Sequence, residues 1–266
     1  ITDTNSSIAA EKVALVVGNN HYTNAADLNN AVNDSKAISD LLTSLGFEVI
    51  ALEDATIDEF YEGLDQFSRE AASARIGLFY FAGHGVEVEG RNYLIPNDAA
   101  LERQSQLRTQ VVSLEVILDE MRSVKLPAKM LILDCCRDNP LTRSWLTTRS
   151  TQKGLASIQD QSLPEATMIL FAAAPGQAAL DGTGANSPFT KALIDELGEP
   201  GRNALDSFYA VSDSVVQETG SRQEPWVKVD GAGRTFRSFS LAPNEGKATT
   251  QPKAPASQAM TPQSAA

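Results

Sequence analysis

The chain is organised around residues 129–140, which run Lys129-Met130-Leu131-Ile132-Leu133-Asp134-Cys135-Cys136-Arg137-Asp138-Asn139-Pro140. An apolar run of the kind found in buried strands ends here in an acid, two thiols and an arginine, and Asn-Pro then marks a turn. The pattern predicts a strand that delivers reactive side chains to its carboxyl end.

Both cysteines of the chain lie in this stretch. Two adjacent cysteines cannot build an ordinary disulfide framework, and the sequence has no further Cys/His set with the spacing of a zinc site. A cysteine at a strand end is more often a packing residue than a nucleophile. Side chains alternate along a strand, so Cys135 and Cys136 are expected to point to opposite faces. We assign packing to Cys135, and we take Cys136, nearer the exit of the strand, as the candidate nucleophile.

A second abrupt motif, Tyr80-Phe81-Ala82-Gly83-His84-Gly85, follows another apolar run and carries one of the two histidines. An imidazole is the usual base for a nucleophilic thiol, which makes His84 the candidate base. The glycines beside it could serve a tight turn, or they could let a substrate approach closely. In the second case, the amides of Gly85 and Cys136 would form an oxyanion hole. The other histidine, His21, lies in a polar loop and is interpreted as a surface residue.

Strand-type apolar runs alternate with segments of helical period along the chain. We expect strands at 12–17, 47–52, 75–82, 128–134 and 166–172, a final strand at 235–241, a hairpin at 86–95, and helices near 34–45, 56–67, 114–121, 187–197 and 203–219. This alternation is typical of an α/β fold, in which helices cover both faces of a mostly parallel sheet. Ligands bind such sheets at the carboxyl ends of the strands. His84 and Cys136 are expected just past the ends of the third and fourth strands, and therefore in one shared site.

Length and charge limit the class of protein. At 266 residues, with 42% hydrophobic and 21% charged residues, the chain fits one large globular domain. Its net charge of −12 would repel a phosphate backbone, so we expect no nucleic-acid partner. No apolar run approaches membrane-spanning length, so we expect no membrane span. The number of subunits does not follow from the sequence.

Composition divides the chain into segments. We expect a flexible N-terminal segment at 1–11, a single domain at 12–242 with an exposed loop at 139–164, and a disordered tail at 243–266 rich in Pro, Ala, Gln and Ser. The first residue is Ile1 rather than Met, which fits a processed terminus. The expected compartment is therefore the cytoplasm or, after removal of an upstream export signal, a place outside it.

Two other kinds of site lack their motifs. The chain has no GxGxxG and no GxxxxGK[ST], so the Gly18-Asn19-Asn20 turn is not interpreted as a nucleotide loop. A phosphatase of the cysteine type needs an arginine six residues past its cysteine, where this chain has Leu141 or Thr142.

The two motifs, in this order and each after an apolar strand, are followed by Ala174-Pro175-Gly176 and then Phe189. With them the chain resembles the caspase-like cysteine peptidases, a group that includes metacaspases and their bacterial relatives, the orthocaspases. The resemblance covers residues 12–241. It implies a caspase-like three-layer sandwich whose central, mostly parallel sheet has about six strands, with helices on both faces.

The resemblance also implies a mechanism. His84 would assist Cys136, whose thiolate attacks a peptide carbonyl, and the amides of Gly85 and Cys136 would hold the oxyanion. Some metacaspases need calcium, but no calcium-loop spacing is visible, so we expect no metal and no other cofactor.

Departures from the caspase pattern indicate the substrate. Where caspases have Gln-Ala-Cys, this chain has Asp134-Cys135-Cys136, and where they carry an arginine that helps to bind an acidic side chain, it has Asp181. Asp34 matches the Asn-Asp of metacaspases, which line their specificity pocket with carboxylates, whereas Ala82 replaces a metacaspase serine. A pocket of carboxylates predicts protein or peptide substrates that are cleaved after Arg or Lys. Alternatively, Asp34 caps a helix and Asp181 belongs to a Gly-rich turn.

Two further consequences depend on this specificity. The 139–164 loop corresponds to the region that caspases cut during maturation, and its Arg143, Arg149 and Lys153 are candidate autocleavage sites. A non-catalytic interaction module with the same fold, or a small-molecule hydrolase with the same dyad, is an alternative function. Retention of both His84 and Cys136 favours the peptidase.

Overall fold

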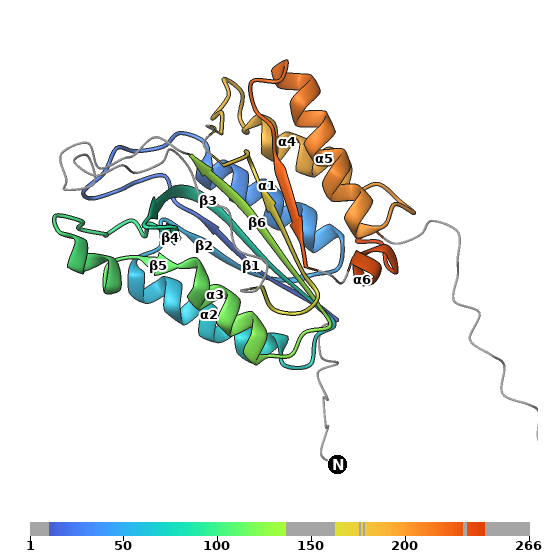
Figure 1. Cartoon of the computed structure of the whole chain (residues 1–266), viewed down its shortest axis with the longest axis horizontal. Helices are drawn as coiled ribbons and strands as arrows, with labels where there is room; N and C mark the ends of the chain where they lie inside the picture. Colours follow the sequence, from blue (N-terminus) through green and yellow to red (C-terminus); the bar gives the residue numbers. More distant parts are fainter. Residues whose placement is uncertain (1–10, 137–162, 176, 178, 231–232, 243–266) are drawn as a thin grey trace, which may run out of the picture.

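The computed structural model describes residues 11–136, 163–175, 177, 179–230 and 233–242 (Figure 1). Among these residues, one sheet contains eight strands, and six of them follow the order β2-β1-β3-β6-β7-β8. The strands are β1 (Lys12–Gly18), β2 (Glu48–Glu53), β3 (Ile76–Val88), β4 (Arg91–Leu94), β5 (Val112–Ser113), β6 (Ala128–Cys136), β7 (Thr167–Phe171) and β8 (Trp226–Val229). Neighbours from β2 to β7 pair in parallel, and β8 pairs antiparallel with β7.

Helices cover both faces of this sheet, which confirms the predicted layers (Figure 1). They are α1 (Ala31–Ser44), α2 (Ile57–Ala71), α3 (Leu114–Ser123), α4 (Pro188–Leu197), α5 (Ala204–Thr219) and α6 (Gly233–Arg237), with a 3-10 helix at Gln104–Arg108. One apolar layer joins the sheet to α1, α4, α5 and α6, and another joins it to α2 and α3. The parallel strands β1, β3, β6 and β7 are buried on both faces, which explains their continuous apolar sequences, whereas the edge strand β2 is largely exposed or half-buried.

Side chains at the helix starts satisfy the first backbone N–H groups. Thr56, Ser113, Ser187 and Asn203 cap α2, α3, α4 and α5. The start of α1 differs, because the side chain of its N-cap residue, Asn30, accepts no bond from the N–H groups of the first turn. Instead, the side-chain oxygen of Asn20 accepts the N–H of Val32 at 3.0 Å. A residue of the preceding loop therefore caps α1.

The structure corrects two predicted elements. The strand expected at 235–241 is wrong: the last strand is β8, and residues 233–237 form α6. The third strand does not end at Ala82 but continues through His84 to Val88, where it pairs with β4 in the predicted hairpin. His84 therefore lies within β3, at the point where β3 leaves the parallel sheet.

Alternation along the strands assigns residues to the two faces. Tyr80 and Ala82 of β3 face α1 and α4, as does Ile132 of β6. Cys135 is buried in the opposite layer, against α2 and α3, as its predicted packing role requires. Since side chains alternate along a strand, Asp134 faces α1 and α4.

Candidate active site at the carboxyl ends of β3 and β6

The backbones of the two candidate catalytic residues lie side by side. In the parallel register of β3 and β6, His84 pairs with Cys136, the last residue of β6. Neighbouring strands are about 4.8 Å apart, so the two backbones are adjacent. The structure therefore brings together the two positions that the sequence places at the ends of separate apolar runs.

The imidazole of His84 is held from the loop between β1 and α1. Its Nε2 lies 2.7 Å from the carbonyl oxygen of Ala26. A carbonyl can only accept, so Nε2 carries the hydrogen in this bond. In the neutral ring, Nδ1 then holds the lone pair and is the nitrogen able to take a proton.

The backbone of β3 turns the amide of Gly85 toward β6. Asn19 donates its N–H to the carbonyl of Ala82 on the β1 side, and Ile95 donates its N–H to the carbonyl of His84. Amides alternate in direction along a strand, so the Gly85 amide points the other way, toward the end of β6. This direction is the one that an oxyanion hole shared with the Cys136 amide requires.

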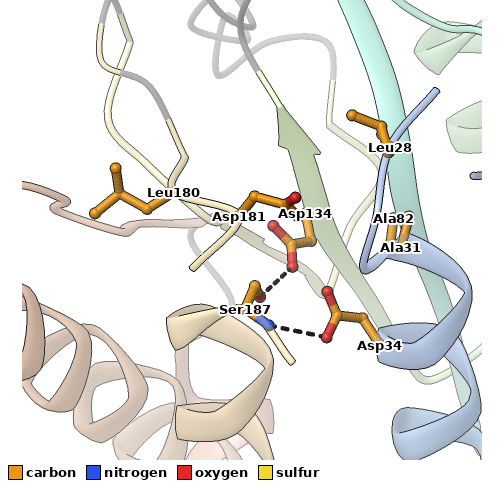
Figure 2. A pocket seen from close by; sticks show the side chains of 9 residues that line it. Leu28, Ala31, Asp34, Ala82, Asp134, Leu180, Asp181 and Ser187 are labelled. Atoms are coloured by element: carbon orange, nitrogen blue, oxygen red, sulfur yellow. Dashed lines mark hydrogen bonds between the residues drawn. The ribbon is translucent and has the colours of Figure 1, made fainter. Parts of the chain in front are cut away.

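A pocket next to these residues contains all three acids selected from the sequence. It has a volume of about 240 Å³, including space open to solvent, and it adjoins Gly83 of β3. Figure 2 shows Asp34 at the start of α1, Asp134 on β6, and Asp181 on the segment before α4. The lining residues are Leu28, Ala31, Asp34, Ala82, Gly83, Asp134, Leu180, Asp181 and Ser187.

Ser187 connects two of the acids (Figure 2). Its hydroxyl donates to Asp134 Oδ2 at 2.9 Å, and its backbone N–H donates to Asp34 Oδ1 at 3.0 Å. The side-chain amide of Asn186 also donates to Asp34 Oδ1, at 2.9 Å, and the hydroxyl of Thr190 donates to Asp134 Oδ2 at 3.3 Å. These donors fix the two carboxylates on one side of the pocket.

Burial raises the pKa of the Asp34 and Asp134 carboxyl groups above the ordinary value. Desolvation raises the pKa of Asp134 to about 8, and the negative charge of Asp34 adds to this rise. Desolvation also raises the pKa of Asp34 to about 6, and Asp181 contributes in the same direction. The hydrogen bonds from Ser187, Thr190 and Asn186 oppose these pKa shifts but do not cancel them. A cation that entered the pocket would relieve the repulsion between the acids.

The structure shows how Asp34 and Asp181 relate to the alternative roles, helix cap and Gly-rich turn. Asp34 does not cap α1; it lies in the first turn, and its carboxylate contacts the segment that precedes α4. Asp181 does precede a glycine with positive φ, Gly182, and its carbonyl accepts a bond from Asn30 at 2.7 Å. It nevertheless lines the pocket. The turn and the pocket roles of Asp181 are therefore compatible.

Several residues of this region were not anticipated from the sequence. Ser187 before Pro188 is a recognisable helix cap, but no local signal indicates that its hydroxyl bonds to Asp134. The loop residues Tyr22 and Ala26, which contact His84, carry no signal at all. His21 is exposed, and its Nδ1 lies 3.3 Å from Asp27. The candidate autocleavage residues 143, 149 and 153 lie outside the described residues, as do the 1–10 and 243–266 segments.

Two kinds of feature are missing from the part of the chain that the structure describes. It contains no group of three or more His, Cys, Asp or Glu side chains arranged to hold a metal ion. None of its helices is both long and apolar enough to cross a membrane.

Known proteins share this sequence pattern and fold. Residues 11–236 match the family model of the caspase domain. The human mucosa-associated lymphoid tissue lymphoma translocation protein 1 and its mouse homolog are each 31% identical over 134 residues, which is 50% of this chain and 16% of each relative. The chain therefore spans 16% of the length of these curated relatives.

Solved structures show the same fold. The Drosophila initiator caspase Dronc superposes with a TM-score of 0.61 at 17% identity, covering 87% of this chain and 87% of that chain. Caspase-1 from Spodoptera frugiperda gives a TM-score of 0.62 at 16% identity, covering 90% of this chain and 92% of that one.

Proposed function

The chain belongs to the caspase-domain family of cysteine peptidases, and on this basis we propose that it is an endopeptidase that cleaves after Arg or Lys. Its base is His84 and its nucleophile is Cys136. The proposal rests on the position of the acidic pocket, which adjoins Gly83, the residue directly before the base His84. A side chain in this pocket would lie beside the bond that the dyad attacks.

The proposed reaction uses the tautomer of His84 described above. The Cys136 thiol gives its proton to Nδ1 of His84, and the thiolate attacks the peptide carbonyl. The amides of Gly85 and Cys136 stabilise the oxyanion. His84 then protonates the leaving amine, and water hydrolyses the thioester with His84 again acting as base. The bond from Nε2 to the Ala26 carbonyl supports this sequence, because it leaves Nδ1 to accept the proton.

The charge of the pocket supports a basic substrate. Asp34 and Asp134 are held on one side and Asp181 lies nearby, so a guanidinium or ammonium group would meet up to three negative charges. A substrate carboxylate would meet like charges and would be rejected. This preference is opposite to cleavage after Asp.

The direct test compares three fluorogenic peptides that differ only in having Arg, Lys or Asp before the cleaved bond. We expect turnover of the Arg and Lys peptides by wild type and none by Cys136→Ala. Cys135→Ala is the matched control, because Cys135 faces the opposite layer, and it should keep its activity per folded molecule. A preference for the Asp peptide contradicts the proposed specificity.

A second experiment separates the peptidase from a non-catalytic module that uses the same pocket to bind a partner. An arginyl chloromethylketone should label wild type covalently and leave Cys136→Ala unmodified. A wild-type protein that binds basic peptides but is neither labelled nor able to cleave them would show that the module is correct. Turnover of esters without peptide cleavage would identify the small-molecule hydrolase.

The same specificity extends to self-processing. We propose that active wild-type protein cuts itself after Arg143, Arg149 or Lys153, and that Cys136→Ala stays intact. Mass spectrometry of both proteins after expression identifies the cleaved bonds. Finding only intact chain in an active wild-type preparation, identical to Cys136→Ala, contradicts self-processing without affecting the proposed activity on peptides.

A further inference from the structure

A short turn in the loop between β1 and α1 joins Tyr22 to Asp27. The carboxylate oxygen Oδ1 of Asp27 accepts the backbone N–H of Tyr22 at 2.9 Å. This bond is the largest cause that holds the pKa of Asp27 below its ordinary value, so the acceptor is charged under ordinary conditions. The bond closes residues 22–27 into a turn, and it fixes the distance between Tyr22 and the carbonyl of Ala26.

Both ends of the 22–27 turn contact His84. At one end, the Tyr22 hydroxyl accepts the backbone N–H of His84 at 2.9 Å, and the two rings are tilted with centroids 4.5 Å apart. At the other end, the carbonyl of Ala26 accepts from Nε2 at 2.7 Å. Tyr22 is 8% exposed and His84 is 4% exposed, so their contact is sheltered from water. Ala26 is exposed, and its bond to Nε2 is only partly buried. The backbone, ring and Nε2 of His84 are thus all held by one turn.

The turn is itself fixed to the sheet. The Oδ1 atom of Asp54, just after β2, accepts the N–H groups of Asn20 at 2.7 Å and His21 at 2.9 Å. The N–H of Thr23 donates to the carbonyl of Asn97 at 2.8 Å. The position of the turn is therefore set from outside the active site, before any substrate binds.

We propose that Tyr22 and Asp27 are positioning residues, which act through the 22–27 turn to hold His84 in the orientation and tautomer that leave Nδ1 as the proton acceptor. The inference rests on the proposed peptidase function for its catalytic consequence. Neither Tyr22 nor Asp27 is among the residues that line the specificity pocket. Loss of either residue should therefore weaken the chemical step and leave substrate binding intact.

The kinetic test uses five variants of the full chain, three at Tyr22 and Asp27 and two controls. In Tyr22→Phe and Asp27→Ala, we expect kcat on an Arg peptide to fall about tenfold or more, because a mispositioned general base loses part of its contribution. KM should stay within about twofold of wild type, since neither substituted side chain lines the pocket. Asp27→Asn keeps a side-chain oxygen that can accept the Tyr22 N–H, and it should recover most of the kcat. Tyr61→Phe and Asp40→Ala are matched controls at exposed positions and should not change kcat.

A spectroscopic test reads the tautomer directly. The chain has only two histidines, so ¹⁵N spectra of histidine-labelled protein contain two sets of ring signals, and His21→Gln assigns them. Wild type should show His84 protonated at Nε2 in its neutral form. Asp27→Ala should show a mixture of tautomers, and Asp27→Asn should resemble wild type. This readout does not need turnover, so it tests the positioning role even if the chain cleaves no peptide.

Two outcomes overturn the inference. One is a wild-type spectrum in which neutral His84 is protonated at Nδ1. The other is a pair of variants, Tyr22→Phe and Asp27→Ala, that melt at a lower temperature but keep the wild-type tautomer and the wild-type kcat per titrated active site. The second result would show that the turn only stabilises the fold.

Discussion

Binding of a basic side chain should expel protons from the specificity pocket. In the empty pocket, burial raises the pKa of Asp134 to about 8 and that of Asp34 to about 6, so the pocket holds protons at neutral pH. A bound guanidinium favours the ionised form of both carboxyls and lowers both pKa values. The protons that the pocket held must then leave, and the affinity for the cation must rise with pH.

The two pKa values give the number of protons released. If both carboxyls are fully ionised in the complex, release should be about 1.5 protons per peptide at pH 6, about 1 at pH 7 and about 0.1 at pH 9. Asp134→Asn removes the weaker acid and retains Asp34. Its release at pH 7 should fall to about 0.1, because Asp34 is then already mostly ionised.

Isothermal titration calorimetry measures this release when one binding reaction is repeated in buffers of different ionisation enthalpy. Cys136→Ala is the parent protein, so that a peptide ending in Arg binds without being cleaved and without thiol ionisation. Asp134→Asn in the same background is the matched variant, and the difference between the two isolates the contribution of Asp134. Equal release from both proteins across pH 6 to 9 would refute the assignment of the proton to Asp134.

Three further results are expected. The pKa of Asp134 is higher in the folded chain than its ordinary value of 3.8, so the free energy of unfolding should fall between about pH 4 and about pH 8. Urea denaturation should show a smaller fall for Asp134→Asn, and parallel pH profiles of the two proteins would contradict this. The buried side chain of Gln223 accepts the N–H of Leu180, a residue of the pocket wall, at 3.0 Å. Gln223→Leu should therefore raise KM for an Arg peptide about tenfold, with a smaller change in kcat. An unchanged KM would show that Leu180 keeps its position without this bond. Phe189 is fully buried between α4 and the sheet, and chemical denaturation of Phe189→Ala should show a loss of about 3–5 kcal/mol; a loss under 1 kcal/mol would mean that the layer readily repacks.

Much of the fold follows from local sequence. The apolar runs predicted five of the six strands along the main path, and amphipathic periodicity predicted the helices that the structure shows capped by Thr56, Ser187 and Asn203. These features depend on periodicity and on side chain–backbone bonds within a few residues. The final strand was misplaced because β8 has only four residues and lies at the edge of the sheet, where its burial is partial and its apolar signal weak.

The continuation of β3 beyond Ala82 was also not predicted from the sequence pattern. The glycines beside His84 suggested a turn, but the strand continues through them into a hairpin with β4. A local pattern cannot distinguish a glycine that ends a strand from one that allows close approach within it. At Gly83 a Cβ atom would lie 2.7 Å from the Tyr22 hydroxyl, and that neighbour comes from a distant loop.

The sequence by itself determined the layered α/β architecture and the types of reactive residue: a thiol at the end of one strand, an imidazole in a glycine-flanked motif of another, and acids nearby. Only the tertiary structure decided that Asp34, Asp134 and Asp181 line one pocket, and that a turn from the β1–α1 loop holds His84. The reason is physical. Asp34 and Ser187, which bond directly, are 153 positions apart in the chain. Contacts of that range form only when packed layers bring separate elements together, and no local periodicity encodes them.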